Sequence, residues 1–203
     1  MKGSTMSEFV KLMQNRRSIY DVGTNTDVTA EDVAARLKEI AKEVPNAFGI
    51  QTTRYVVVSG EKNKELWTLL HDTQKNVLSE EMYERMKKQL VNGKNGLGTV
   101  LLFESREAVE SMPANEVRQT LYKENNHGIA VAATWLALTE MGLGTNLQHF
   151  NVGYDKGFDK PIRELLGLPD DYEMLAQMYF GSIETPAGPK ETMPVDEQVF
   201  LVE

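Results

Sequence analysis

A long apolar helix in the second half of the chain limits the possible folds more than any other sequence feature. From His127 to Met141 the residues are apolar on nearly every face of a helix, and small side chains recur among them. A helix with this pattern is buried on several sides, and small residues let neighbouring elements approach it closely. We therefore expect a central helix that is covered by other layers of the same domain.

Three runs of β-branched and aromatic residues predict buried strands at 54–59, 99–103 and 174–180. Apolar residues at helical spacing predict further helices between and around these strands. Their expected ranges are Ser7 to Asn15, Thr29 to Val44, Lys62 to His71, Ser79 to Leu90 and Pro161 to Leu166. The last stretch, Gln198 to Val202, is predicted to be extended. Because helices separate the strands, this order predicts a mixed α and β fold rather than a series of hairpins.

The second of these helices has the clearest boundaries. Thr29 is followed three residues later by Asp32, which resembles a capping box, and Pro45 ends the helical pattern. The chain shows no internal repeat and no low-complexity linker. We therefore expect residues 1–203 to form a single domain.

The composition excludes several classes of protein. There is no cysteine among the 203 residues, which removes disulfide scaffolds, thiolate zinc sites, iron–sulfur clusters and cysteine nucleophiles, and a reducing cytoplasm is the expected location. The 22 Lys and Arg residues face 30 Asp and Glu residues, so the formal net charge is -8. We expect no nucleic-acid partner, because no basic field covers the protein. Any phosphate must be held by a few cations gathered in one place.

Apolar segments are too short for a membrane protein. The longest, such as 99–103, fall far short of the roughly 20 residues that cross a bilayer, so we expect no membrane span. The first six residues carry one positive charge but lead into no apolar segment. We therefore do not expect a secretory signal peptide there.

Common catalytic and nucleotide-binding motifs are missing. The stretch Gly142–Leu147 offers G-x-G-x-x, but the third glycine is absent and the stretch follows a helix instead of a strand. Neither G-x-x-x-x-G-K-[ST] nor G-x-S-x-G occurs. The three histidines are far apart in sequence, and Glu124 with His127 forms only a single E-x-x-H. We therefore expect no metal site and no catalytic dyad or triad.

Three polar clusters remain, and each has two interpretations. Asn15–Ser18 places two guanidiniums and a hydroxyl together, either as a fork for phosphate or carboxylate or as a solvated helix C-cap. Pro45–Thr53 surrounds one aromatic with amides and hydroxyls, either to grip a planar heterocycle or as a capped loop. Gly144–Asn151 is rich in hydrogen-bonding groups for a segment that enters the interior. Buried polar groups require partners, which a bound ligand would supply if the protein itself does not.

Taken together, the three clusters resemble the FMN-dependent nitroreductase family. The resemblance rests on Asn-Arg-Arg-Ser after the first helix, Pro-Asn-Ala-Phe-x-x-Gln-Thr-Thr-Arg before a strand, and Gly-Leu-Gly-Thr-Asn-Leu-Gln-His-Phe-Asn after the apolar helix. The last motif is similar to the signature of a short subgroup. The implied fold is an α/β (α+β) sandwich with a central, mostly antiparallel sheet flanked by helices. The resemblance also implies an intertwined homodimer in which the C-terminal strand crosses to the partner's sheet.

The same resemblance implies which residues bind FMN. Positions that match the family's phosphate, ribityl and ring contacts are Arg16, Arg17, Ser18, Asn46, Gln51, Leu147, Gln148, His149 and Lys190. Asn46 and Gln51 are expected to reach the ring from the neighbouring subunit or from their own. One departure is Tyr20, which stands where many relatives have a second basic residue, two positions after the serine. In residues 76–98 we find no match to the flavin-contacting Asn and Lys of longer relatives.

The implied function is that of an NAD(P)H-dependent oxidoreductase. In such enzymes FMN carries the chemistry, so no catalytic side chain is expected. Hydride from NADH or NADPH would reduce the flavin, and a nitroaromatic, quinone or similar small-molecule acceptor would then take its place, with ping-pong kinetics. Two alternatives stay open, a flavin reductase and a non-catalytic flavin-binding or sensing module.

Overall fold

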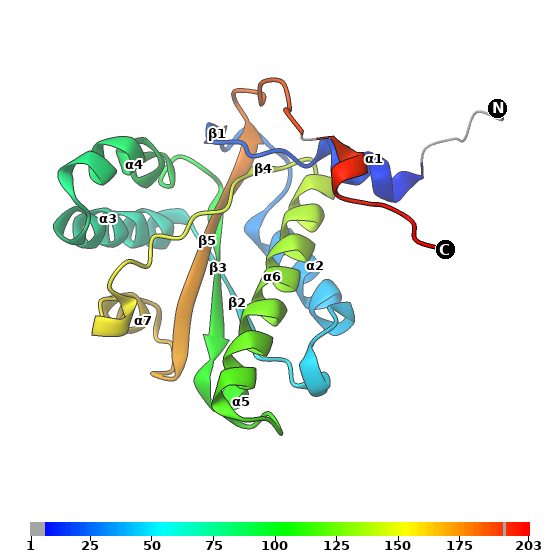
Figure 1. Ribbon diagram of the computed structural model, residues 1–203. Helices are drawn as coiled ribbons and strands as arrows, with labels where there is room; N and C mark the ends of the chain where they lie inside the picture. The colour runs from blue at the N-terminus through cyan, green and yellow to red at the C-terminus, as the bar shows by residue number, and fades with distance from the viewer. Residues whose placement is uncertain (1–6, 193) are drawn as a thin grey trace.

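An antiparallel sheet lies at the centre of the protein (Figure 1). The computed structural model describes residues 7–192 and 194–203. Its strands are β1 (Val22–Gly23), β2 (Thr53–Ser59), β3 (Gly98–Ser105), β4 (Gly144–Thr145) and β5 (Tyr172–Ile183). They are ordered β1-β5-β3-β2, β4 also pairs with β5, and all these pairings are antiparallel. The expectation about a signal peptide at residues 1–6 lies outside the described residues.

Helices cover both faces of this sheet. In Figure 1, α3 (Gly60–Val77), α4 (Glu80–Asn92) and α7 (Lys160–Leu166) lie on one side, and α2 (Ala30–Glu43) and α6 (Glu116–Glu140) lie on the other. The helix α1 (Glu8–Asn15) packs against α6, and the short α5 (Arg106–Glu110) follows β3. Three 3-10 turns complete the described elements: η1 (Ala47–Gly49), η2 (Tyr154–Lys156) and η3 (Val195–Glu197).

The middle of the central strand β3, Val100 to Phe103, is apolar on both of its faces. Val100 and Leu102 pack with α2 and α6, whereas Leu101 and Phe103 pack with α3 and α7. Successive side chains of a strand point to opposite faces, and here both faces are covered. All eight residues of β3 are therefore buried.

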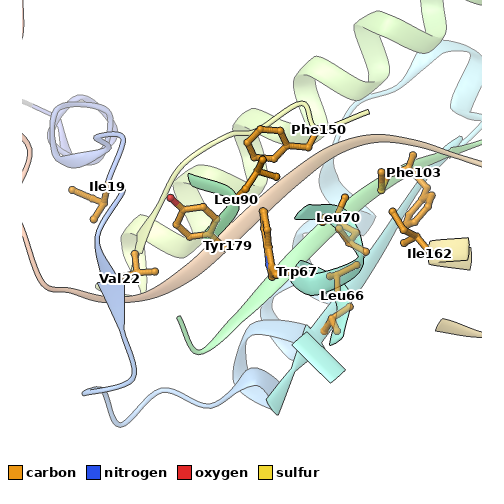
Figure 2. Packing of buried hydrophobic residues seen from close by; sticks show 13 residues of the cluster. Ile19, Val22, Leu66, Trp67, Leu70, Leu90, Phe103, Phe150, Ile162 and Tyr179 are labelled. Atoms are coloured by element: carbon orange, nitrogen blue, oxygen red, sulfur yellow. The ribbon is translucent and has the colours of Figure 1, made fainter. Parts of the chain in front are cut away.

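The core on the α3 side is organised around Trp67 (Figure 2). Its ring meets Tyr179 edge-on at 5.5 Å and Phe150 at 6.1 Å between centroids. Its indole N–H donates to Thr99 Oγ1 at 2.8 Å, and the Thr99 hydroxyl donates to Asn63 Oδ1 at 2.7 Å. The buried polar groups of Trp67, Thr99 and Asn63 thus have hydrogen-bond partners, as buried polar groups require.

Most of the predicted elements are present, with differences at their ends. The capping box of α2 is confirmed, because Asp32 N donates to Thr29 Oγ1 and Thr29 N donates to the Asp32 carboxylate. The predicted start of the central helix is wrong, since α6 begins at Glu116 and spans 25 residues. Its first three turns are largely exposed and polar, so they lack the apolar pattern that marks the rest. The helix predicted to end near His71 continues to Val77.

Two short strands were not predicted. Both β1 and β4 contain two residues and pair with β5. Segments this short carry no periodicity, and their pairing depends on β5. Residues 198–202 lie outside the described helices and strands, and Val199 to Val202 are 76 to 82% exposed.

None of the helices in the described part of the chain combines the length and the hydropathy that a membrane span requires.

Candidate functional site

The segment that follows α1 is fixed by hydrogen bonds to the loop after α6. Arg16 caps α1, with its N–H donating to Leu12 O at 3.0 Å. Ile19 N then donates to Thr145 O at 2.9 Å, and Asn146 Nδ2 donates to Ile19 O at 2.7 Å. This pairing orders the backbone on both sides of Ser18, although the segment belongs to no long strand.

A groove of about 470 Å³ opens beside this segment. Four of the sequence-predicted residues line it together: Arg16, Arg17, Ser18 and Lys190. The other lining residues are Tyr20, Asp21, Lys88, Thr185, Pro186, Ala187 and Gly188. The structure thus gathers four cations and one carboxylate in a protein of net charge -8. Such a groove is suited to an anion such as phosphate.

Two contacts hold the arginines in place. The Arg16 guanidinium lies over the Trp135 ring, 4.5 Å from its centroid, in a cation–π contact. Arg17 Nη2 donates to Gly188 O at 2.6 Å and thereby ties the segment that carries Lys190 to the end of α1. The carboxylate of Asp21 accepts a hydrogen bond from Thr185 Oγ1 at 2.8 Å.

Asn46 and Gln51 line a different hollow, of about 340 Å³, between the end of α2 and β2. Asn46 Nδ2 donates to Val44 O at 3.1 Å, but its Oδ1 is buried without a partner among the described residues. Gln51 Nε2 donates to Ala41 O at 3.3 Å. This hollow shares no lining residue with the groove.

The turn beside this hollow exposes an aromatic ring. Phe48 has φ of 58°, in the left-handed region that non-glycine residues rarely adopt. Its side chain is 54% exposed and meets Tyr122 of α6 edge-on, at 5.4 Å between centroids. The turn is held by Asn126, whose Oδ1 accepts from Ala47 N at 2.9 Å and whose Nδ2 donates to Thr52 Oγ1 at 3.1 Å.

Leu147, Gln148 and His149 line neither cavity. The loop's hydrogen-bonding needs are met largely inside the protein: Gln148 Nε2 donates to Asn146 Oδ1 at 2.6 Å, and Thr145 Oγ1 donates to Tyr179 O at 2.9 Å. Of the two alternatives that the sequence left open, partners within the protein account for Thr145, Asn146 and the Gln148 Nε2 group. The distinction required coordinates, because a sequence shows donors but not their partners.

His149 is the titratable group of this loop. Burial lowers its pKa below the ordinary value, the neighbouring His127 lowers it further, and Glu124 acts in the opposite direction. His127 is a buried residue of α6, with Nδ1 3.7 Å from the buried carboxylate of Glu104. We therefore expect neutral His149 at neutral pH, able to donate from one ring nitrogen and accept at the other.

Sequence reasoning missed the contribution of α4. Lys88 lines the groove, and Asn92, one turn later, donates from Nδ2 to Tyr20 O at 3.1 Å. Both residues lie within 76–98, where the sequence offered no match. No local signal distinguishes Lys88 from the other surface lysines of this amphipathic helix. Among the described residues, no group of three or more His, Asp and Glu side chains is placed to hold a metal ion.

A family comparison identifies the chain. A model of the nitroreductase family matches residues 13–182. The chain belongs to the nitroreductase family. Membership implies oxidoreductase activity, and the predicted fold class, a mixed helical sandwich around an antiparallel sheet, is confirmed.

Individual nitroreductase relatives support this result. The solved structure of the nitroreductase CinD from Lactococcus lactis, in complex with chloramphenicol, is 30% identical, covers 97% of this chain and 100% of its own, and has a TM-score of 0.81. The protein HBN1 of Saccharomyces cerevisiae is 28% identical over 97% of this chain and 99% of its own length. A nitroreductase from Desulfitobacterium hafniense, solved with bound FMN, shares the fold at 18% identity, with a TM-score of 0.76, and the likeness covers 98% of this chain and 100% of that one.

Proposed function

We propose that this nitroreductase-family chain is an FMN-dependent oxidoreductase that takes hydride from NADH or NADPH and reduces nitroaromatic, quinone or similar acceptors by a ping-pong mechanism. The observation that carries the proposal is the groove in which Arg16, Arg17, Ser18 and Lys190 meet. Lys190 lies more than 170 positions along the sequence from the other three residues. A concentration of cations in an otherwise acidic protein indicates an anionic ligand. The Gly-Leu-Gly-Thr-Asn-Leu-Gln-His-Phe-Asn motif further supports a place in the short subgroup.

The residues present fit flavin mononucleotide. Guanidinium, ammonium and hydroxyl groups are the usual partners of phosphate, and the groove supplies all three. The heterocyclic ring needs amide partners, and Asn46 offers a buried carbonyl oxygen that has no partner among the described residues. We therefore assign the groove to the phosphate and ribityl chain, and the amides of Asn46, Gln51 and Gln148, with Leu147 and His149, to the ring.

When bound, FMN supplies the hydride-transfer chemistry. The chain's own residues bind and orient. Arg16, Ser18 and Lys190 hold the anionic tail. Arg17, which already donates to Gly188 O, keeps the segment carrying Lys190 against α1. The amides of Asn46, Gln51 and Gln148 would supply donors to the polar edge of the ring, and donors oriented in advance would favour its reduced, more negative form.

The acceptor class is proposed from the family and from CinD, whose solved complexes contain chloramphenicol and 4-nitrophenol. Both are nitroaromatic compounds. We extend this class to the present chain, and extend it to quinones because they are also planar two-electron acceptors.

We propose that the working unit is a homodimer in which the second copy completes the site. Two residues of α6 show how far apart the two cavities lie. Asn126 lines the hollow, and Trp135 contacts Arg16 of the groove. They are nine residues apart, which corresponds to about 14 Å along the helix axis. Large apolar side chains are exposed in the single chain on α1, on α6 and at the chain end: Phe9 64%, Val117 80%, Leu121 47%, Ile129 40% and Phe200 76%. Their number on these elements supports an interface there. The segment 198–202 is proposed to pair with the partner's sheet.

We also propose that residues 1–203 form a single domain and that the protein is cytoplasmic. Support for the location is the absence of cysteine in the sequence.

The deciding experiment is the visible spectrum of the purified protein, followed by turnover. We expect flavin absorbance, bleaching of the flavin by NADH or NADPH under anaerobic conditions, and recovery of the oxidised spectrum on addition of 4-nitrophenol or a quinone. A colourless protein that acquires no FMN on incubation would contradict the proposal. Bleaching with FMN as the only accepted oxidant would instead indicate a flavin reductase. Bound FMN that accepts no hydride would indicate a sensing module.

A further inference from the structure

A buried carboxylate lies behind the hollow between α2 and β2. Glu104, near the end of β3, is 0% exposed. It is the cross-strand partner of Thr53 on β2, and Thr53 Oγ1 donates to Glu104 Oε1 at 2.6 Å. Thr53 is only half-buried and lines the hollow beside Asn46 and Gln51. One hydroxyl group therefore connects a carboxylate in the interior with the space that holds the amides assigned to the ring.

The carboxylate of Glu104 also faces a histidine of α6. His127 Nδ1 lies 3.7 Å from Glu104 Oε1, beyond hydrogen-bond distance. Both ring nitrogens of His127 and Oε2 of Glu104 are buried without a hydrogen-bond partner among the described residues. Buried polar groups with a structural role are normally hydrogen-bonded, so these three atoms require another explanation.

The nearby permanent charges are engaged elsewhere. Glu173 on β5 is the other cross-strand partner of Glu104, and Lys123, one turn before His127 on α6, pairs with Glu173 at 3.1 Å and with Glu124 at 3.4 Å. Within the described part of the chain, His127 is the one basic group within 4.0 Å of the Glu104 carboxylate. Glu104 is thus left with a hydroxyl group and an imidazole, and both can pass on a proton.

We propose that Thr53 donates a proton to the electron acceptor, and that Glu104 is a positioning residue behind it that returns a proton to the Thr53 hydroxyl. The inference rests on the proposed function. In the structure Thr53 donates to Glu104. When Glu104 is protonated, its O–H can donate to Thr53 instead, and the Thr53 hydrogen turns toward the hollow, because a hydroxyl group rotates and both donates and accepts.

The step has a defined proton and electron balance. Conversion of a quinone to a hydroquinone, or of a nitro group to a nitroso group and water, consumes one hydride and one proton. The proposed flavin chemistry supplies the hydride. The Thr53 O–H bond breaks as the new O–H bond of the product forms, and the Thr53 oxygen takes the proton of Glu104.

Glu104 then regains its proton from solvent before the next turnover. One route is His127, which is close enough to the exposed His149 to influence its protonation. The phenol of Tyr55 on β2 also lies near Glu104, but burial and the Glu104 charge raise its pKa to about 12, so it does not exchange protons readily near neutral pH.

The first test separates the two half-reactions by stopped-flow absorbance. Thr53→Val removes the hydroxyl and keeps the branched shape of the side chain. Reduction of the flavin by NADH or NADPH should be unchanged, because it requires no proton from the protein. Reoxidation by a quinone should be slower by about a hundredfold, the scale of general acid catalysis. Reoxidation by ferricyanide, which takes electrons without a proton, should keep its wild-type rate.

Two further variants complete this comparison. Thr53→Ser keeps a hydroxyl at the same position and should retain most of the quinone rate. Thr68→Val is the matched control, since Thr68 lies on α3, donates to Lys64 O and lines neither cavity. It should behave like wild type in every half-reaction.

Infrared spectroscopy of the protein as purified tests Glu104 without turnover. A protonated carboxyl group has a C=O stretch that is separate from the amide bands. We expect such a band within the pH range in which the enzyme turns over. It should be lost in Glu104→Gln and shifted in Thr53→Val, where the hydrogen bond to Thr53 is missing. Glu173→Gln should retain the band, because Glu173 pairs with Lys123.

Three results would overturn the inference while leaving the proposed function intact. The first is an equal rate of quinone reduction in wild type and Thr53→Val. The second is an equal slowing of Thr53→Val with quinone and with ferricyanide, which would indicate a structural role. The third is the absence of a Glu104 carboxyl band throughout the pH range of turnover. Wild-type protein that binds no flavin, or whose flavin accepts no hydride, would overturn the proposed function and this inference together.

Discussion

Arg16 connects the central helix to the proposed phosphate site. Its guanidinium lies over the Trp135 ring of α6, and the residue is half-buried at the mouth of the groove. The stacking leaves the edge of the guanidinium, where its N–H donors lie, open to a ligand. Trp135 thus limits the rotamers of Arg16 and prepares it for binding.

Removing this side chain should weaken cofactor binding. We expect Arg16→Ala to lower the affinity for FMN by about 1.5 to 3 kcal/mol, because a charge-assisted hydrogen bond is lost. Arg36→Ala is the control, since Arg36 pairs with Glu39 and Glu140 on the surface and lines neither cavity. Equal FMN dissociation constants for Arg16→Ala and wild type, measured by fluorescence titration, would remove Arg16 from the site.

Two tyrosines, the half-buried Tyr55 and the buried Tyr179, predict sensitivity to alkaline pH. Burial, reinforced by Glu104, raises the pKa of Tyr55 to about 12, and burial also raises the pKa of Tyr179. Tyrosine in an unfolded chain ionises near pH 10. Above that pH the unfolded state binds fewer protons than the folded state, so the free energy of unfolding falls between about pH 10 and 12.

Tyr55→Phe tests this directly. The hydroxyl of Tyr55 forms no hydrogen bond among the described residues, so the substitution removes the titrating group with little other change. Urea denaturation at pH 9 and pH 11 should show a smaller loss of stability in Tyr55→Phe than in wild type. The same loss in both proteins would show that Tyr55 does not contribute.

At the scale of elements, the close contact between β1 and β5 explains why position 181 is occupied by glycine. A Cβ on Gly181 would lie 2.0 Å from Gly23 O, a distance that the backbone cannot tolerate. The two strands approach closely there, and β1 continues the segment that carries Ser18 and Tyr20.

Gly181→Ala should destabilise the protein by at least about 1 to 3 kcal/mol, because the clash is with backbone and not with a side chain that can move. Gly188→Ala is the matched control, since nothing lies within 4 Å of its added Cβ. The midpoints of urea denaturation compare the two. A Gly181→Ala protein as stable as Gly188→Ala would mean that β1 shifts without cost.

Part of the central helix α6 could be predicted from the sequence, and part could not. Its buried half was predicted from residues 127–141, because apolar residues on every face have no other stable arrangement. Its first part, from Glu116, was missed because its apolar residues Val117 and Leu121 are exposed in the single chain and its other residues are mostly polar. A segment with so few buried apolar residues shows no helical pattern in the sequence, so it cannot be told from a loop before the structure is known.

At the scale of the whole molecule, the exposed face of α6 predicts the oligomeric state. Leu121→Glu places a charge in the proposed dimer interface, where a buried unpaired charge is costly. We expect the variant to sediment as a monomer and, on the proposal that a second copy contributes Asn46 and Gln51 to the site, to bind FMN more weakly than wild type. Analytical ultracentrifugation and FMN titration measure the two effects.

Val77→Glu serves as the control for this substitution. Val77 has a similar exposure, 43% against 47% for Leu121, and lies on α3, across the sheet from α6 (Figure 1). This variant should retain the oligomeric state of wild type. A monomeric wild-type protein with full FMN affinity would contradict the proposed role of the second copy.

The sequence by itself determined the elements that local chemistry encodes. Capping at Thr29 and Asp32, the stop at Pro45 and the apolar runs of the long strands act within a few residues, so they can be recognised without coordinates. The motif resemblance likewise assigned Arg16 and Lys190 to one ligand, and the fold brings both residues to one groove.

Only the tertiary structure decided what packing and register bring together. Lys88 reaches the groove because α4 packs against α3 and Asn92 Nδ2 donates to Tyr20 O. The two-residue strands form because β5 offers them backbone partners. The buried polar loop is satisfied by groups up to 127 positions away. Exposed cations and isolated amides carry no hydrophobic periodicity, and their function depends on neighbours that the linear sequence does not specify.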